Sequence, residues 1–108
     1  MHSVLLPTAY LPPIHYFSLL LKSETVFIEQ HEHFVKQTYR SRCDILSSNG
    51  ILSLSIPLQK KGDKELISEK RISYAEEWQM KHWRAITSAY KNSAYFEYFE
   101  DDFKPFYF

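Results

Sequence analysis

The sequence predicts an α/β fold made of an N-terminal βαβ unit, an appended antiparallel hairpin and C-terminal helices. The first observation behind this prediction is the order of the apolar runs within residues 4–30, where a strand pattern, a helical pattern and a second strand pattern follow one another. The second is the pair Asn49-Gly50 between two strand-like arms, which indicates a hairpin. An α+β fold with an entirely antiparallel sheet is the alternative.

The N-terminal pattern begins with the apolar residues 4–6, which are typical of the end of a buried strand that Pro7 stops. Pro12 and Pro13 suit the entrance of a helix, because the ring fixes φ and the missing N–H needs no partner there. Apolar residues then recur every three or four positions, which predicts an amphipathic helix over 14–22. The β-branched and aromatic run "TVFIEQ" predicts a second buried strand, parallel to the first.

Two arms flank the predicted hairpin turn, "KQTYRSRCDIL" before it and "ILSLSIPLQ" after it. Asn49-Gly50 predicts a type I′ turn, in which both residues take positive φ. The second arm alternates apolar and polar residues, as a half-buried strand does. Beyond it, the composition predicts a solvated turn over 60–65 and a further strand over 66–73.

The last part of the chain is predicted to be helical. Ser73 and Glu76 have the spacing of a capping box, so a helix is expected from Ser73 to about Lys91. Ser93 can cap a second helix, which Pro105 ends or kinks. The segment 95–108 then holds eight aromatic residues, too many for one buried helical stripe. We therefore expect self-association through this segment, most simply as a homodimer.

Composition limits the classes of protein that this chain can belong to. A chain of 108 residues makes at most one domain. Its 13 basic and 13 acidic residues give no net charge, so neither nucleic acid nor anionic lipid is an expected partner. Two glycines argue against a glycine-rich phosphate loop. Because Cys43 is alone and prolines interrupt the N-terminal apolar run, we expect a cytoplasmic protein without membrane insertion.

Two groups of residues are candidates for binding an anionic ligand. The proline-rich loop places Tyr10 and the first-turn His15 at the carboxyl end of the first strand, where open α/β sheets bind ligands. Arg40 and Arg42 alternate along the predicted strand 36–46, so they would share one face, and two guanidiniums suit a phosphate or carboxylate. Each group also has a purely structural interpretation. The loop could be a rigid connection whose aromatic residues belong to the core, and the two arginines could lie on a solvent-exposed strand face.

His82 lies four residues after Trp78, on the apolar stripe of the predicted helix. It is either a hydrogen-bonded core residue or a general acid–base group beside an anionic substrate, and the nearby Arg84 favours the second interpretation. His31 and His33 lack the spacing of a metal-binding motif, so no metal site is predicted. No cofactor is predicted either.

Four stretches resemble, in this order, the bacterial WbqC-like family: "LPTAYLPPIHYFSLL", "TVFIEQHEHFVKQTYRSRC", "NGILSLSIPL" and "ISYAEEWQMKHWRAITSAYKNSAYFEYFEDDFKPF". The resemblance covers nearly the whole chain, and its specific motifs are Arg-x-Arg, Trp-x-x-x-His-Trp-Arg and Ser-x-Tyr-Phe. Family members generally continue past the point where this chain stops. Residues 1–108 therefore look like the N-terminal part of a longer family domain. Members occur in loci for O-antigen and other surface polysaccharides.

The resemblance implies a transferase-like enzyme of surface-polysaccharide biosynthesis that binds an activated sugar or another phosphate-bearing metabolite. The positions that match the family pattern include Tyr10, Gln37, Arg40, Arg42 and His82. A non-catalytic binding or assembly protein of the same pathway is the contrasting alternative. A weaker likeness to nucleotidylyltransferases rests on Pro13 and His15. Whether the chain is an enzyme stays open from the sequence.

Overall fold

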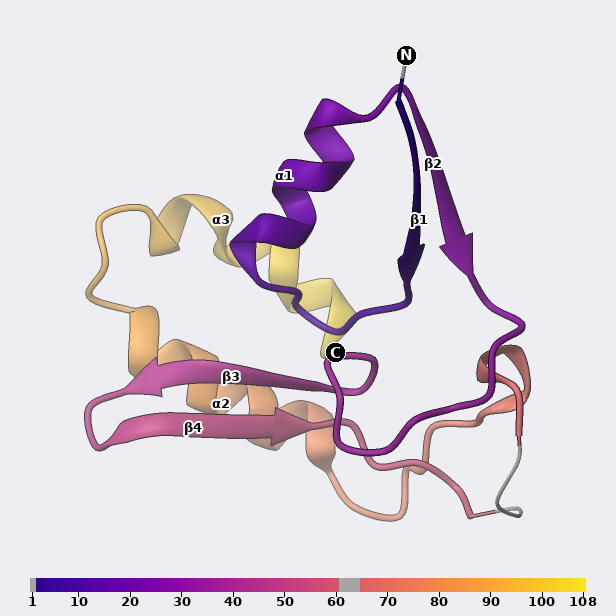
Figure 1. Cartoon of the computed structure of the whole chain (residues 1–108). Helices are drawn as coiled ribbons and strands as arrows, with labels where there is room; N and C mark the ends of the chain where they lie inside the picture. The colour runs from indigo at the N-terminus through magenta and orange to yellow at the C-terminus, as the bar shows by residue number, and fades with distance from the viewer. Residues whose placement is uncertain (1, 61–64) are drawn as a thin grey trace. The chain divides into compact units, whose positions relative to one another are not determined.

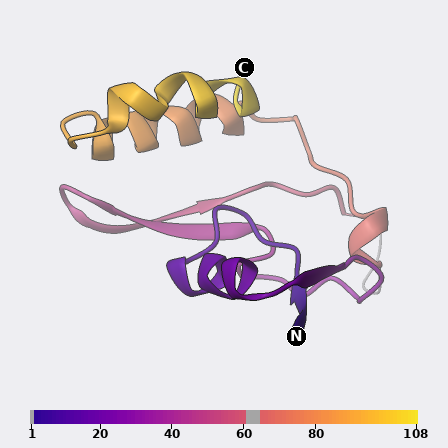
Figure 2. The same cartoon turned by 90° about the horizontal axis from the view of Figure 1, so that it is seen from above.

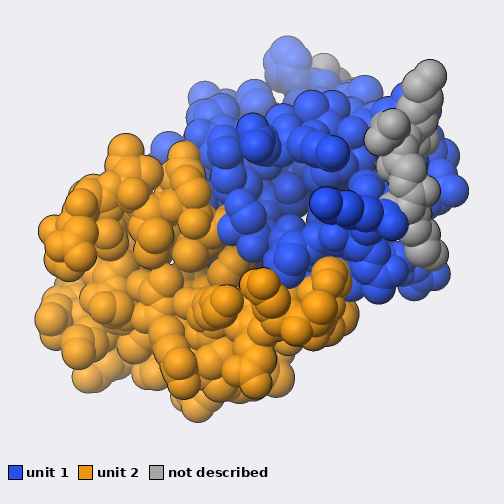
Figure 3. Space-filling model, turned by 90° about the horizontal axis from the view of Figure 1, so that it is seen from below, with its two compact units in different colours: residues 1–43, 55–72 blue, residues 44–54, 73–108 orange. Residues whose placement is uncertain are grey.

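The structure is a computed structural model, and it describes residues 2–60 and 65–108 (Figure 1). The chain forms two compact units (Figure 3). The first consists of residues 1–43 and 55–72, and the second of residues 44–54 and 73–108. The described residues contain a parallel strand pair, an antiparallel hairpin and three α-helices, so the chain mixes helices and strands as an α/β or α+β fold does.

The first unit contains the predicted βαβ arrangement. Strands β1 (Ser3–Pro7) and β2 (Thr25–Glu29) pair in parallel, with Ser3 opposite Thr25 and Pro7 opposite Glu29. Helix α1 (Ile14–Lys22) connects them, as Figures 1 and 2 show. Pro13 occupies the N-cap position with φ −68°, the value that its ring imposes on a helix entrance. The prediction of a parallel pair around a first helix is confirmed.

The predicted strand 36–46 is shorter than expected. Strand β3 (Arg42–Ser47) starts only at Arg42, and residues 36–41 form a turn. Gln37 adopts a left-handed backbone conformation with φ 56°, which reverses the chain direction. The carbonyl of Thr38 then accepts hydrogen bonds from the amides of Ser41 at 3.2 Å and Arg42 at 3.1 Å. The prediction that Arg40 and Arg42 share the face of one strand is therefore wrong.

The hairpin itself is confirmed, with β4 (Gly50–Ser55) as its second strand. Its turn differs from the type I′ prediction, because only Gly50 takes positive φ, 114°, and Asn49 does not. Two hydroxyls reinforce the turn and the strand pair. The Ser47 hydroxyl donates to the Gly50 carbonyl at 2.7 Å, and the Ser53 hydroxyl donates to an oxygen of Asp44 at 2.6 Å.

No continuous strand covers 66–73 within the described residues. Instead, the 3-10 helix η1 (Ile67–Glu69) lies between two isolated bridges, Leu66 with His33 and Ile72 with Leu58. A carboxylate oxygen of Glu69 accepts from the Leu66 amide at 3.2 Å, which favours a local turn over a strand ladder. Most of the turn predicted over 60–65 lies outside the described residues.

The second unit carries α2 (Trp78–Tyr90), α3 (Phe96–Phe103) and the 3-10 helix η2 (Lys104–Phe106), and Figure 2 shows α2 and α3 side by side. Helix α2 begins later than predicted. The Ser73 hydroxyl accepts from the Ala75 amide at 3.4 Å, in a local turn, and caps no helix. Ser93 is not a cap either, because its hydroxyl donates to the carbonyl of Tyr90 at 2.7 Å. Pro105 in η2 ends the last α-helix, as predicted.

Trp83 is the centre of the packing in the second unit. Its ring lies 5.6 Å from Tyr107, 6.3 Å from Phe96 and 6.4 Å from Phe108, measured between ring centroids. The side-chain amide of Gln79 donates to the carbonyl of Phe106 at 3.3 Å. These contacts fold the C-terminal segment back onto α2. Within residues 2–60 and 65–108, no helix has the length and apolar character needed to cross a bilayer.

Candidate functional site

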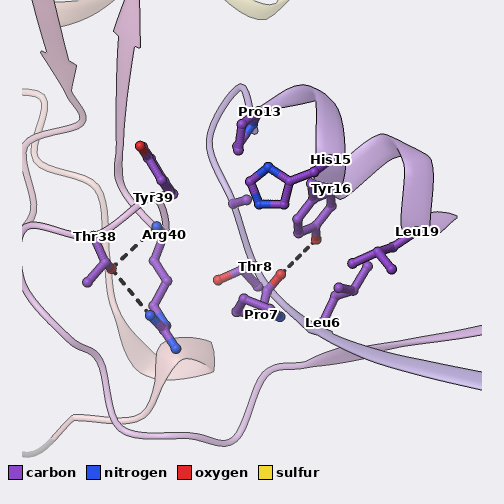
Figure 4. Close-up of a pocket in the computed structure, with 11 residues that line it drawn as sticks. Leu6, Pro7, Thr8, Pro13, His15, Tyr16, Leu19, Thr38, Tyr39 and Arg40 are labelled. Carbon is purple, nitrogen blue, oxygen red and sulfur yellow. Dashed lines mark hydrogen bonds between the residues drawn. The ribbon is translucent and has the colours of Figure 1, made fainter.

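A cavity of about 260 Å³ lies in the first unit (Figure 4). Three segments build it: the end of β1 with the loop that follows, the first turns of α1, and the turn at residues 38–40. It thus lies at the carboxyl end of β1, where the sequence predicts a ligand pocket, and beside the N-terminus of α1. A helix N-terminus carries a partial positive charge, which favours anions.

Hydrogen bonds hold the loop and the turn in place around this cavity. The Tyr16 hydroxyl donates to the Pro7 carbonyl at 2.7 Å, which joins α1 to the end of β1 (Figure 4). Burial raises the pKa of Tyr16 above its ordinary value of 10.0, which further favours the protonated form that donates this hydrogen bond. The Tyr10 amide donates to the Tyr39 carbonyl at 2.8 Å, which joins the proline-rich loop to the turn. One side-chain hydrogen bond and one backbone hydrogen bond therefore hold the cavity walls together.

Arg40 forms a forked ion pair with Glu32. Its Nε donates to Glu32 Oε1 at 2.5 Å, and its Nη2 donates to Oε2 at 3.1 Å. Its Nη1 also lies 3.4 Å from the Thr38 hydroxyl oxygen. The hydrogen bond from Arg40 is the largest cause that lowers the pKa of Glu32. Glu32 balances the charge of Arg40, so the guanidinium acts at the cavity as a fixed directional donor.

This pair predicts a pH dependence of stability. Because the folded-state pKa of Glu32 is lowered, its contribution is present above the ordinary value of 4.5 and is lost as pH falls through the lowered pKa. We expect wild type to have a higher Tm than Glu32→Gln at neutral pH, and the difference to shrink and then vanish as pH falls below 4.5 and through the lowered pKa of Glu32. Thermal denaturation from acidic to neutral pH measures it. The exposed Glu24→Gln serves as control, and an equal pH profile for both variants would contradict the prediction.

The remaining polar groups at the cavity come from all three segments. Thr8 contributes a hydroxyl from the loop, His15 an exposed imidazole from α1, and Thr38 a hydroxyl from the turn. The cavity is slightly smaller than most ligand pockets, which enclose about 300–1,000 Å³, so it suits a small ligand or one group of a larger ligand. It offers hydroxyl, imidazole and guanidinium donors, a set that suits the oxygens of a phosphate group or a sugar.

The structure brings together two of the predicted ligand-binding residues and separates the others. His15 and Arg40 line the same cavity, although they are 25 positions apart in the sequence. Tyr10 joins the loop to the turn through its amide, and Gln37 is exposed on the turn. Arg42 begins β3, and its Nε is buried without a hydrogen-bond partner among the described residues. Glu32 was missed by sequence reasoning, because no motif spacing links it to Arg40.

His82 lies in the second unit. Its side chain is buried, with 5% of its surface exposed, and its ring is 5.2 Å from that of Trp78 in an edge-on arrangement. Arg84 is exposed, so it does not share the buried environment of His82. His82 does not line the cavity of the first unit. Across the described part of the chain, no three histidine, cysteine or acidic side chains come together as metal ligands.

Comparison with known proteins places the chain in a family. The model of the WbqC-like protein family matches residues 8–108. The chain belongs to the WbqC-like protein family. It is also 28% identical over 98 residues to the uncharacterized protein Rv1507c of Mycobacterium tuberculosis, a match that covers 91% of this chain and 42% of that protein. No solved structure matches the chain.

The WbqC-like match includes the site. It begins at Thr8, the first loop residue after β1, and therefore contains the proline-rich loop, α1 and the turn that carries Arg40. Leu6 and Pro7 are the cavity residues that precede it. The chain spans less than half, 42%, of the length of the curated relative that it matches.

Proposed function

We propose that this WbqC-like chain is the N-terminal part of a longer family domain. We further propose that it binds an activated sugar or another phosphate-bearing metabolite. The complete protein would be a cytoplasmic, transferase-like enzyme of O-antigen or other surface-polysaccharide biosynthesis. One observation carries the proposal. His15 and Arg40 line one cavity at the carboxyl end of β1, beside the N-terminus of α1. Three kinds of positive or donating group thus surround a space that a small ligand can enter.

The ion pair with Glu32 fits such a ligand. Two N–H groups of Arg40 are held by the carboxylate, which fixes the plane of the guanidinium before a ligand arrives. A guanidinium has five N–H donors, so other donors remain for a ligand. His15 is exposed, which allows its imidazole to approach a phosphate that enters the cavity.

A binding role without catalysis is the second candidate, and one observation favours it. His82, the predicted acid–base residue, is buried in the second unit and is not a residue of this cavity. An assay for product formation from nucleotide-sugars separates the candidates. Turnover would support the enzyme, and saturable binding without turnover would support the binding protein.

Calorimetric titration with inorganic phosphate, a sugar 1-phosphate and nucleotide-sugars tests the binding site. We expect His15→Ala and Arg40→Ala each to weaken binding by about tenfold or more, because a hydrogen bond to a charged group contributes about 1.5–3 kcal/mol. Glu32→Gln keeps Arg40 and should weaken binding less than Arg40→Ala does. Arg71→Ala, an exposed arginine of the same unit outside the cavity, is the matched control. Equal affinity of wild type and both cavity variants would contradict the proposed site.

We also propose that the chain forms a homodimer through its C-terminal aromatic segment, residues 95–108. Most aromatic side chains there are exposed, among them Tyr98 at 77% and Phe106 at 74%. The exceptions are Tyr107, which is buried, and Phe96, which is half-buried, and both pack against Trp83. Burying such an apolar face against a second copy of the chain removes it from water, which lowers the free energy and favours the dimer.

A further inference from the structure

The second unit has its own candidate site on α2. A shallow cavity of about 360 Å³ is lined by Trp83, Arg84, Thr87, Ser88 and Lys91. Counted from Arg84, the polar residues follow at three, four and seven positions, so they lie on one face of the helix. All five residues belong to the second unit, so the site is separate from the cavity of the first unit.

The two cations of this face are not neutralised. Neither Arg84 nor Lys91 takes part in an ion pair among residues 2–60 and 65–108. No acidic residue lines the cavity, although acidic side chains make up 13 of the 108 residues. Both cations are exposed, so their charged groups can reach an ion from solvent. The face therefore carries two positive charges, on residues two helical turns apart.

Thr87 supplies the second, independent observation. Its hydroxyl oxygen is buried and has no hydrogen-bond partner in the described structure. A helical threonine usually satisfies its hydroxyl on the carbonyl one turn earlier, and such a bond is missing here. Ser88 places another hydroxyl at the same cavity. Buried hydroxyls without a partner are rare, so a ligand oxygen that entered the cavity lined by Thr87 would supply the missing acceptor.

We propose that this face of α2 binds the phosphate group of a small metabolite. Arg84 and Lys91 are two turns apart, about 10 Å along the helix axis, and their long side chains can close on an ion held above Thr87 and Ser88. The guanidinium gives directional donors and the ammonium a compact charge, while the hydroxyls donate from the floor of the cavity. The buried Trp83, packed against Tyr107 and Phe96, forms a rigid wall.

Backbone amide NMR of the whole chain with inorganic phosphate and pyrophosphate tests this site. We expect saturable shifts at Thr87 and Ser88, and at least a tenfold loss of affinity in Arg84→Ala with Lys91→Ala. Thr87→Val keeps the shape and removes the hydroxyl, so it should weaken binding severalfold. Lys81→Ala, which removes a cation of α2 outside this cavity, is the matched control and should bind as wild type does.

Three results would overturn the site. The first is unchanged phosphate affinity in the double variant. The second is equal weakening by Lys81→Ala and by the double variant, since that would indicate general attraction to the charge of the chain. The third is shifts confined to residues around His15, because they would report the cavity of the first unit alone. Thr87→Val separates loss of the hydroxyl from loss of the fold, because its amide spectrum can be compared with that of wild type before phosphate is added.

Discussion

Replacing Trp83 with alanine is expected to destabilise the second unit by about 3–5 kcal/mol, the usual cost of removing a large buried aromatic. Trp83 is 8% exposed and contacts the rings of Phe96, Tyr107 and Phe108. Its removal takes away the surface on which the C-terminal segment packs. Since small domains are stable by about 5–15 kcal/mol, most of the margin of this unit would be lost.

Chemical denaturation followed by circular dichroism measures this effect. Trp83→Phe keeps an aromatic ring and should cost clearly less than the alanine variant. Ile51→Thr is the matched control, because this side chain of the second unit is 77% exposed, lies outside residues 95–108, and exposed substitutions stay within about 0.5 kcal/mol. If Trp83→Ala and Ile51→Thr unfolded at the same denaturant concentration, Trp83 would not be the centre of the packing.

The second large effect concerns self-association. We expect the chain to be dimeric at tens of micromolar, and Tyr98→Ser combined with Phe106→Ser to raise the dimer dissociation constant at least a hundredfold. Burying an aromatic side chain contributes about 1.5–3 kcal/mol, so losing two of them accounts for a change of this size. Analytical ultracentrifugation over a dilution series gives the constant directly.

The control for this experiment lies in the first unit. Leu21 on α1 is 88% exposed, so Leu21→Ser removes an equally accessible apolar side chain from outside residues 95–108. It should leave the dissociation constant unchanged. A wild-type chain that stays monomeric at high micromolar concentration would contradict the proposal, as would a dimer that Leu21→Ser weakens as much as the double variant does.

Sequence alone determined the elements whose signals are local. Pro7 marks the end of β1 and Pro13 marks the start of α1. The spacing of the apolar residues between Pro13 and Lys22 indicates the length of the helix. The parallel pair followed from the order of strand, helix and strand. Asn49-Gly50 marked the hairpin, although Gly50 alone supplies the positive φ. Such features depend on residues close together in the chain, so a pattern can reveal them.

The tertiary structure decided where elements begin and end, because several backbone conformations compete at those positions. Ser73 satisfies the Ala75 amide in a turn, which leaves α2 to begin at Trp78. The left-handed Gln37 turns residues 36–41 away from the strand that their alternation predicts. The local sequence allows both alternatives at each of these places, a helix or a turn at Ser73 and a strand or a turn at residues 36–41. It does not show which one is more stable, because contacts with distant residues change the difference in free energy.

The candidate site is also a product of tertiary structure. His15 was visible as a first-turn residue of α1 and Arg40 as one of two alternating arginines, and no spacing indicated that both line one cavity. The Tyr10 amide on the Tyr39 carbonyl and the fork between Arg40 and Glu32 bring the loop and the turn together. Hydrogen bonds and ion pairs between segments far apart in the chain produce no periodic pattern or motif in the sequence. The residues of the site could therefore be proposed one by one, and only the folded chain shows which of them act at the same place.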